Sequence, residues 1–185
     1  MDRPLNRKAT SIKVIGIDPG LAATGVGVLT GMKSKVVAYA YGTINTPSHA
    51  PQAFRLEKIF SHLCRLFEEE KPNLLVIEDV FSLDRYPKSG ISLGKVCGVI
   101  LLAGQQFGLP IEEIPVREAK KVLTGNGSAG KEQLETAVRL SIGCPKPIRP
   151  YHASDALGLA LIGLFRYGEA RLEYLNCSRK LRPIV

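Results

Sequence analysis

The sequence predicts a three-layer α/β domain built around a mixed β-sheet, and three observations support this. Three strand-like segments near the start of the chain are joined by short links, as in antiparallel hairpins. Helical and strand-like segments then alternate, which indicates a sheet with helices packed on its faces. The chain has 185 residues, of which 45% are hydrophobic, and this is enough to bury the core of one domain.

Local patterns place the elements along the chain. Residues 12–18 are rich in β-branched types and end at Asp18-Pro19-Gly20, which predicts a buried strand followed by a tight turn. Gly31 lies in a short link that favours antiparallel pairing of the next two strands. Apolar residues recur at helical spacing over residues 52–70, which predicts an amphipathic helix that ends before Pro72.

The second half of the chain alternates helices and strands, and three prolines break it before its last strong element, an almost wholly apolar helix. In order, we expect strands at 12–18, 24–29 and 36–44, a helix at 52–70, a strand at 73–80, an irregular loop at 82–90, a small-residue helix to about 107, a strand at 111–116, a short helix at 118–123, a further helix from about 128, and the last helix at about 152–167.

Composition and charge narrow the possible functions. The chain has 25 Lys and Arg against 17 Asp and Glu, and the formal net charge of +8 favours a polyanionic partner. Without any C-x-x-C spacing, the cysteines suggest neither a zinc site nor a disulfide framework, and we expect free thiols in a reducing cytoplasm. No segment approaches the roughly 20 uninterrupted apolar residues that span a bilayer, so we expect a soluble, cytoplasmic protein with no membrane partner. The cysteines are Cys64, Cys97, Cys144 and Cys177.

Two carboxylates occur in strongly apolar strand patterns. Asp18 ends Val-Ile-Gly-Ile-Asp, and Glu78 lies within Leu-Leu-Val-Ile-Glu-Asp-Val. An ionised carboxylate loses much of its hydration in such a run, so we expect each to be paired, hydrogen-bonded or bound to a cation. His152 and Asp155 are three residues apart, so they share one face if both lie on the last helix.

These residues have structural interpretations beside the functional one. Asp18 also fits a turn residue before Pro19-Gly20, and Ser154 or Asp155 also fits the cap of the last helix. Taken together, adjacent strands would bring Asp18 and Glu78 close, and a helix packed on that sheet would bring Asp155 beside them. Hard oxygen ligands of this kind suit Mg²⁺ or Mn²⁺, so we predict a site for divalent ions.

A glycine-rich segment runs from Gly125 to Lys131. It has Walker A spacing, but Glu132 stands where Ser or Thr would bind Mg²⁺, and no strong strand precedes it. Ser128 and Lys131 have the S-x-x-K spacing of penicillin-binding enzymes, but the companion sequences are missing. A glycine-rich loop that opens a helix beside a lysine is still a good place to hold a phosphate. Ser128 as a solvated N-cap is compatible with that role.

Over about residues 12–168 the chain resembles the RuvC family of bacterial Holliday-junction resolvases, which have a ribonuclease H-like fold. The motifs that carry the resemblance are Ile17-Asp18-Pro19-Gly20 with Thr24-Gly25, Ile77-Glu78-Asp79-Val80-Phe81, Leu93-Gly94, Arg117-Glu-Ala-Lys120, Gly127-Ser-Ala-Gly-Lys131 and His152-Ala-Ser-Asp155-Ala-Leu157. The resemblance implies a ribonuclease H-like nuclease domain at 12–168 with a mixed five-stranded sheet flanked by helices. A flexible N-terminal extension at 1–11 and a poorly ordered C-terminal tail at 169–185 would flank that domain.

The resemblance implies a structure-specific endonuclease that resolves four-way DNA junctions in recombination and repair by paired, symmetric hydrolysis. Four residues of the family bind two divalent ions, here expected to be Mg²⁺ with Mn²⁺ able to substitute. The matching positions are Asp18, which would bind both ions, Glu78, His152 and Asp155. The position that contacts the junction near its crossover matches Phe81, and the phosphate-binding lysines match Lys120 and Lys131. Phe81 could also be a core residue, but we expect it to stack on an unpaired base.

The resemblance further implies a homodimer, with the RuvA and RuvB branch-migration proteins as partners. A two-fold dimer would present one site to each of two opposed strands of a junction. The small-residue segment from Gly94 to Gly104 fits the packing surface of that dimer, and it equally fits a helix packed closely on its own sheet. His152 stands where some members have a third aspartate, and the loop 82–90 differs from the family, so metal and cleavage preferences are not carried over.

Two other classes of protein fit part of the pattern. A junction-binding module that has lost catalysis would share the fold, but the intact Asp18, Glu78 and Asp155 argue against it. A phosphotransferase of the actin and sugar-kinase superfamily would share the sheet and an Asp-x-Gly turn. The 185 residues are too few for the two-domain clamp of that superfamily.

Overall fold

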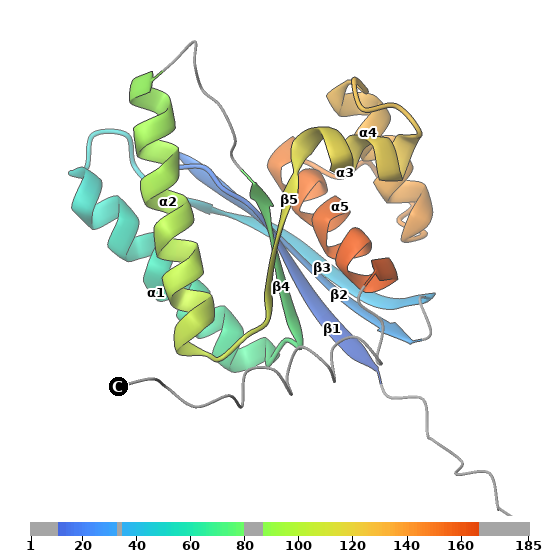
Figure 1. Cartoon of the computed structure of the whole chain (residues 1–185), viewed down its shortest axis with the longest axis horizontal. Helices are drawn as coiled ribbons and strands as arrows, with labels where there is room; N and C mark the ends of the chain where they lie inside the picture. Colours follow the sequence, from blue (N-terminus) through green and yellow to red (C-terminus); the bar gives the residue numbers. More distant parts are fainter. Residues whose placement is uncertain (1–10, 33–34, 80–86, 167–185) are drawn as a thin grey trace, which may run out of the picture.

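The computed structural model describes residues 11–32, 35–79 and 87–166, which form a central sheet with helices on both faces (Figure 1). In chain order the elements are β1 (Ile12–Asp18), β2 (Ala23–Met32), β3 (Lys35–Asn45), α1 (Gln52–Glu70), β4 (Leu74–Asp79), α2 (Pro87–Gln106), β5 (Ile111–Pro115), α3 (Val116–Thr124), α4 (Lys131–Ser141) and α5 (Tyr151–Arg166).

The sheet has the order β3-β2-β1-β4-β5 and mixes two kinds of pairing. β1, β2 and β3 pair antiparallel, as the short links between them predict, whereas β4 runs parallel to β1 and β5 runs parallel to β4. The parallel pairs are joined by long connections that contain α1 and α2, because parallel strands need a crossover. The predicted mixed five-stranded sheet is therefore confirmed.

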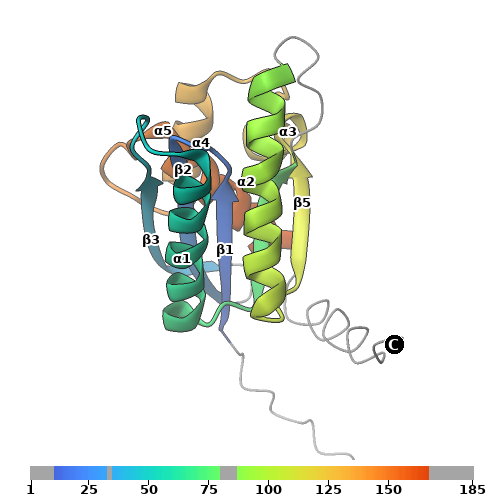
Figure 2. The same cartoon turned by 90° about the vertical axis from the view of Figure 1, so that its left-hand side faces the viewer.

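The two faces of the sheet are covered by different helices and bury separate cores. α1 and α2 lie on one face, as Figure 2 shows, and their apolar side chains pack on residues such as Ile15 and Ile77. α5 lies directly on the other face against β1 and β2, and α3 and α4 pack around it. This burial explains why α5 is almost wholly apolar, since residues from Ala156 to Leu164 are all buried.

Several element boundaries differ from the sequence predictions. The predicted irregular loop at 82–90 is wrong at its end, because α2 begins at Pro87, and proline suits the first turn of a helix. α4 begins at Lys131 rather than near Ser128, and its N-cap is Gly130, whose N–H donates to Gln133 Oε1 at 3.0 Å. Ser128 is not the cap; its N–H donates to Asn126 Oδ1 at 2.9 Å in the preceding turn.

The predicted N-terminal extension and C-terminal tail lie outside the described residues, apart from Ser11. Within the described ranges, no helix is both long enough and apolar enough to cross a membrane. Cys64, Cys97 and Cys144 are free thiols, as expected, and Cys177 lies in the undescribed part of the chain.

Candidate active site

Asp18 and Glu78 lie at the ends of neighbouring parallel strands. Ile17 of β1 pairs with Ile77 of β4, so the next residue of each strand lies at the same level of the sheet. Side chains alternate between the faces of a strand, and both isoleucines point into the core under α1 and α2. The two carboxylates therefore project from the opposite face, which α5 covers.

Three glycines allow α5 to lie against the strands that carry this site. A Cβ on Gly16 would lie 2.0 Å from the Ala156 carbonyl oxygen, and one on Gly25 would lie 2.0 Å from the His152 carbonyl oxygen. At Gly27 a Cβ would lie 2.5 Å from the Leu157 nitrogen. These distances are shorter than any van der Waals contact, so only glycine permits this approach of helix backbone to sheet.

The close approach places the start of α5 over the end of β1. His152 Nδ1 lies 2.5 Å from Asp18 Oδ2, and the Asp18 residue is only 7% exposed. Asp155, one helical turn further on, lines the same hollow as Asp18, Glu78 and His152. The four residues that the sequence singled out therefore come together in one place, from β1, β4 and α5.

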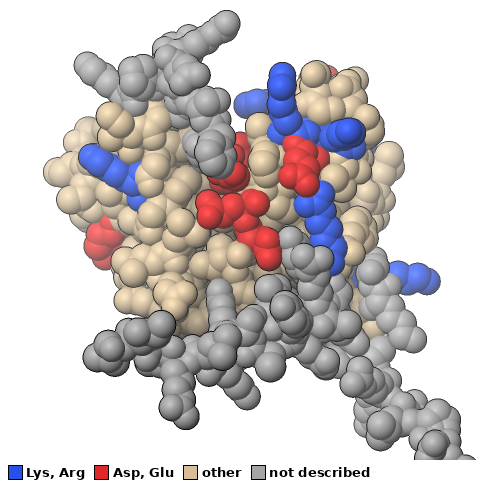
Figure 3. All heavy atoms as spheres, in the orientation of Figure 1, with Lys and Arg blue, Asp and Glu red and all other residues tan. Residues whose placement is uncertain are grey.

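Two lysines complete the lining of this hollow, whose volume is about 220 Å³. Lys120 comes from α3 and Lys131 from the first residue of α4. Figure 3 shows acidic side chains gathered between the two groups of helices, with basic side chains on the side of α3 and α4. The hollow thus brings two cations close to the acidic side chains.

Burial raises the pKa of each carboxyl group in the hollow. The pKa of Glu78 rises to about 8, mainly by burial and then by the charge of Asp18 and a hydrogen bond with it. The pKa of Asp155 rises to about 6 for the same first cause, with the charge of Asp18 adding to it. Burial also raises the pKa of Asp18, against the lowering effect of His152. Full ionisation of the three carboxyl groups would therefore place more negative charge in the site than its surroundings stabilise.

The donor atoms fit a divalent cation. Asp155 Oδ1 is buried and has no hydrogen-bond partner among the described residues, although a buried carboxylate oxygen is costly to leave unpaired. Three carboxylates and one imidazole form a mostly hard set of ligands, which suits Mg²⁺ or Mn²⁺. Across residues 11–32, 35–79 and 87–166, no three such side chains already converge at ligand distance. Asp18 and His152 instead contact each other.

The structural interpretations of these residues are wrong. α5 begins at Tyr151, so Ser154 and Asp155 lie inside the helix and do not cap it. The Ser154 hydroxyl donates to the Tyr151 carbonyl oxygen at 2.8 Å. The turn after β1 is held by Thr24, whose hydroxyl donates to the Gly20 carbonyl oxygen at 2.8 Å. The Asp18 carboxylate is turned to His152 instead.

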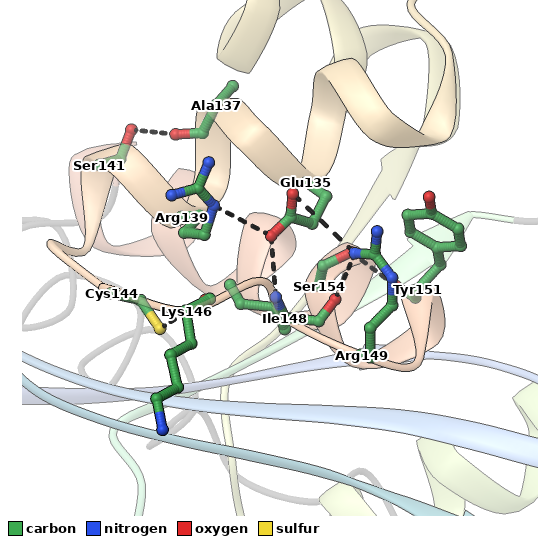
Figure 4. Close-up of polar contacts among 10 residues, drawn as sticks. All are labelled: Glu135, Ala137, Arg139, Ser141, Cys144, Lys146, Ile148, Arg149, Tyr151 and Ser154. Carbon is green, nitrogen blue, oxygen red and sulfur yellow. Dashed lines mark hydrogen bonds and ion pairs between the residues drawn. The ribbon is translucent and has the colours of Figure 1, made fainter.

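A buried carboxylate outside the hollow holds the start of α5 in place. Glu135 of α4 is 4% exposed and accepts a hydrogen bond from the Ile148 N–H at 2.8 Å (Figure 4). Its charge is balanced by Arg139, with Nε 3.3 Å away, and by Arg149, with a nitrogen 4.0 Å away. Glu135 thus ties the loop that leads into His152 to the body of α4.

Some contributors to the site were not found from the sequence. Glu135 has no motif around it, and its role depends on a hydrogen bond with a loop residue 13 positions later in the chain. Gly16 and Gly27 stood in plain strand patterns that gave no sign of a helix above them, although alternating glycines in a strand can indicate a close backbone approach. Phe81 lies outside the described residues, so its position is not part of this geometry.

The mixed sheet and the carboxylate hollow define the class of protein. A solved structure of T. thermophilus RuvC in complex with Holliday junction substrate matches with a TM-score of 0.78 and 28% identity, over 88% of this chain and 96% of that chain. The protein thus has the ribonuclease H-like fold expected from the sequence, in the form found in nucleases.

The particular family follows from the sequence comparisons. The family model for "Crossover junction endodeoxyribonuclease RuvC" matches residues 14–163. The chain is 37% identical to the protein of that name from Carboxydothermus hydrogenoformans, over 85% of this chain and 98% of the relative. It is 39% identical to that from Prosthecochloris aestuarii, over 82% and 80%. The chain belongs to the RuvC family of crossover junction endodeoxyribonucleases.

Proposed function

We propose that this protein resolves four-way DNA junctions in recombination and repair by divalent-metal-dependent hydrolysis at the hollow around Asp18. One observation carries the proposal: three carboxylates with raised pKa values meet beside two lysines on the face under α5. Such a cluster is unfavourable while it is empty and favourable when cations neutralise it.

Two Mg²⁺ ions, or Mn²⁺ in their place, fit the donor set of this chain. Asp18, Glu78 and Asp155 would supply oxygens, including the buried Asp155 Oδ1 that has no partner among the described residues, and His152 would supply a nitrogen. Asp18, which lies between Glu78 and His152, is the proposed ligand of both ions. Bound there, the ions would activate a water and stabilise the leaving 3′ oxygen of a phosphodiester.

The lysines of the hollow would hold the substrate. Lys131 is the first residue of α4, so a phosphate beside it would also face the free backbone N–H groups at the start of that helix. Lys120 extends from α3 into the same hollow. Both lysines already lower the pKa of Asp155, as expected of cations that face the acidic cluster. In their proposed role, they fix the scissile phosphate next to the ions.

The proposed substrate is a four-way junction, which has approximate two-fold symmetry. The related T. thermophilus protein was solved with Holliday junction substrate, and a homodimer would present one site to each opposed strand. We include RuvA and RuvB as partners of this assembly on the basis of family membership. Phe81, which lies outside the described residues, is proposed to contact the junction near its crossover, and the nuclease domain is proposed to span 12–168.

One face of α2 supports the homodimer. Gly94 and Gly98 have open space where a Cβ would lie, and Ile91 and Leu102 on the same face are 63% and 54% exposed. Gly104 differs, because a Cβ there would lie 2.8 Å from side chains of the sheet. The two interpretations of this segment thus apply to different faces of α2: the face with Val96, Ile100 and Gly104 packs on the sheet, and the face with Gly94 and Gly98 is open to a second copy.

The test is a nicking assay on a synthetic four-way junction and on linear duplex of the same sequence, each with Mg²⁺, Mn²⁺ or EDTA. We expect paired nicks in the junction with either metal and none in EDTA. Equal cutting of linear duplex would contradict the junction specificity, and cutting in EDTA would contradict the metal dependence.

A further inference from the structure

Beyond the hollow, a band of tyrosines and cations runs along β3 and the loop before α5, and the proposed chemistry uses none of it. We call this band the tyrosine strip; it consists of Tyr39, Tyr41, Lys146, Arg149 and Tyr151.

The first two tyrosines lie on the same face of the sheet as the active site. Tyr39 pairs with Leu29, which belongs to the core under α5, and Tyr41 pairs with Gly27, above which α5 packs. Their rings stack with centroids 6.4 Å apart and an interplanar angle of 12°. Tyr39 is 37% exposed and Tyr41 is 38% exposed, so this ordered aromatic pair is accessible to a partner.

The loop before α5 adds the cations. Tyr39 lies near this loop, since the neighbouring Cys144 raises the pKa of its hydroxyl. Arg149 lies over the ring of Tyr151, 4.2 Å from its centroid. Lys146 points away from Glu135 in Figure 4 and forms no ion pair within the described residues. Its charge is therefore available to a ligand.

The strip is continuous with the active site. Tyr151 immediately precedes His152, and Thr43, two residues beyond Tyr41, pairs with Gly25 directly beneath the His152 backbone. From Thr43 to Tyr39 the strand covers about 13 Å, at about 3.3 Å per residue. That length corresponds to about four base pairs of DNA, at about 3.4 Å each.

The charge of this region favours a polyanion. The sequence has no Asp or Glu from Pro19 to Leu56 and none from Thr136 to Ser154, so the strands and the loop that carry the strip contribute no carboxylate. Glu135, the acid of α4 that accepts a hydrogen bond from the loop, is buried. Tyrosine hydroxyls, lysine and arginine are all common donors to phosphate oxygens.

We propose that the tyrosine strip binds the phosphate backbone of one duplex arm of the junction, beginning next to the scissile phosphate. This inference rests on the proposed function, because the active site defines where the arm begins. The stacked rings hold the two hydroxyls in a fixed row, while Lys146 supplies charge and Arg149, which also faces Glu135, adds guanidinium donors. A tyrosine- and arginine-rich surface also occurs in protein interfaces, so the experiment must separate the two.

The experiment measures junction binding by the full chain in EDTA across a range of salt concentrations. The variants are Lys146→Gln and the pair Tyr39→Phe with Tyr41→Phe, which keeps the stacked rings. Lys58→Gln is the matched control, since Lys58 is a cation of α1, on the opposite face of the sheet, and is not one of the residues that line a hollow with Tyr41. Each protein is tested on a normal junction and on one with neutral methylphosphonate linkages about four base pairs from the cut.

We expect Lys146→Gln to lower the slope of log affinity against log salt by about one unit, and Lys58→Gln to leave it unchanged. The tyrosine pair should weaken binding several-fold. On the neutralised junction the parent should lose affinity, and Lys146→Gln should add little further loss, because the two changes remove the same contact. An unchanged slope, or losses that simply add, would overturn the proposal. A parent that neither binds nor cuts junctions would instead refute the proposed function itself.

Discussion

His152 and Asp18 are 134 positions apart in the chain, yet His152 Nδ1 lies 2.5 Å from Asp18 Oδ2. The contact joins the first turn of α5 to the last residue of β1, and the imidazole partly offsets the cost of burying the carboxylate. An imidazole held in this way is already beside the proposed metal ligands, so its replacement tests the site directly.

His152→Ala should lose most nicking activity with either metal, because a cation held partly by this nitrogen would be under-coordinated. His152→Asp should remain active and shift its preference toward Mg²⁺, since an all-oxygen site favours Mn²⁺ less than a mixed one. Single-turnover cleavage of one junction by the three proteins, in Mg²⁺ and in Mn²⁺, measures both effects. If His152→Ala cuts as fast as the parent in both metals, His152 is not a ligand.

Neutral replacements of the carboxylates should separate cutting from binding. Asp18→Asn, Glu78→Gln and Asp155→Asn each remove a proposed ligand charge but no phosphate contact. Their loss of nicking should exceed the roughly 10–100-fold cost of changing residues that only support metal ligands. Junction binding in EDTA should persist. Glu132→Gln, an exposed acid beside Lys131, is the control and should cut like the parent; a near-parental rate in any of the first three would remove that residue from the site.

Lys120→Ala and Lys131→Ala should weaken junction binding and lower its salt dependence by about one unit of slope each. The effect should diminish at high salt, where releasing counterions into a more concentrated solution gains less free energy. Lys58→Ala on α1 removes the same charge on the far face of the sheet and should change little. Binding isotherms at several salt concentrations give the slopes, and identical slopes in all four proteins would show that Lys120 and Lys131 are ordinary surface charges.

The raised carboxyl pKa values predict how stability depends on pH when no metal is present. The pKa of Glu78 rises from an ordinary value of 4.5 to about 8 in the folded protein, and that of Asp155 rises from 3.8 to about 6. Between these values, the folded protein holds protons that the unfolded chain has released. Stability should therefore fall as pH rises through this window. Thermal unfolding in EDTA from pH 5 to pH 8 should show a decreasing midpoint, and Mg²⁺ should restore it at pH 8.

Glu78→Gln provides the control for this effect, because it removes the carboxyl group whose pKa is raised most. The variant should melt higher than the parent at pH 8 in EDTA, by about 2–4 °C for each kcal/mol of relief, and similarly to the parent at pH 5. A parent whose midpoint in EDTA rises with pH would contradict the buried, mutually repelling cluster.

Gly25→Ala should disturb the site through the backbone. Its Cβ would lie 2.0 Å from the His152 carbonyl oxygen, so α5 must shift or the strand must distort, at a cost of about 1–3 kcal/mol. Nicking should fall with it, because His152 moves away from Asp18. Gly42→Ala in the same sheet meets nothing within 4 Å and should leave both stability and nicking close to those of the parent. Urea unfolding and the junction assay measure the two quantities.

The parts of the site that were predictable are those in which local pattern and chemistry agree. An acid near the end of a buried strand, as at Asp18 and Glu78, is costly to bury unless it is paired or binds a cation. The spacing of His152 and Asp155 places them on one face of a helix. The start of α4 was not predictable, since Ser128 and Gly130 are both acceptable caps. The side chain of Asn126 decides between them by accepting the Ser128 N–H.

Contacts between distant segments were harder to anticipate. Nothing around Gly16 or Gly27 says which face of the strand a helix will cover, and that depends on the whole order of the sheet. The loop predicted at 82–90 ends earlier in the structure, because α2 begins at Pro87. Pro87 and Gly90 both indicate irregular backbone, but a proline at the first helical position is compatible with a helix.

Glu135 connects the helix that carries a proposed phosphate contact to the loop before a proposed metal ligand. α4 begins with Lys131, and its Glu135 accepts a hydrogen bond from the Ile148 N–H in the loop that leads into α5 and His152. A displacement of Lys131 by bound DNA would reach the imidazole through one turn of α4, one buried hydrogen bond and the short loop from Ile148 to Tyr151. Seating the nucleic acid and adjusting the catalytic pocket would then be a single motion, so severing this link should slow the reaction even where both ends of it stay intact.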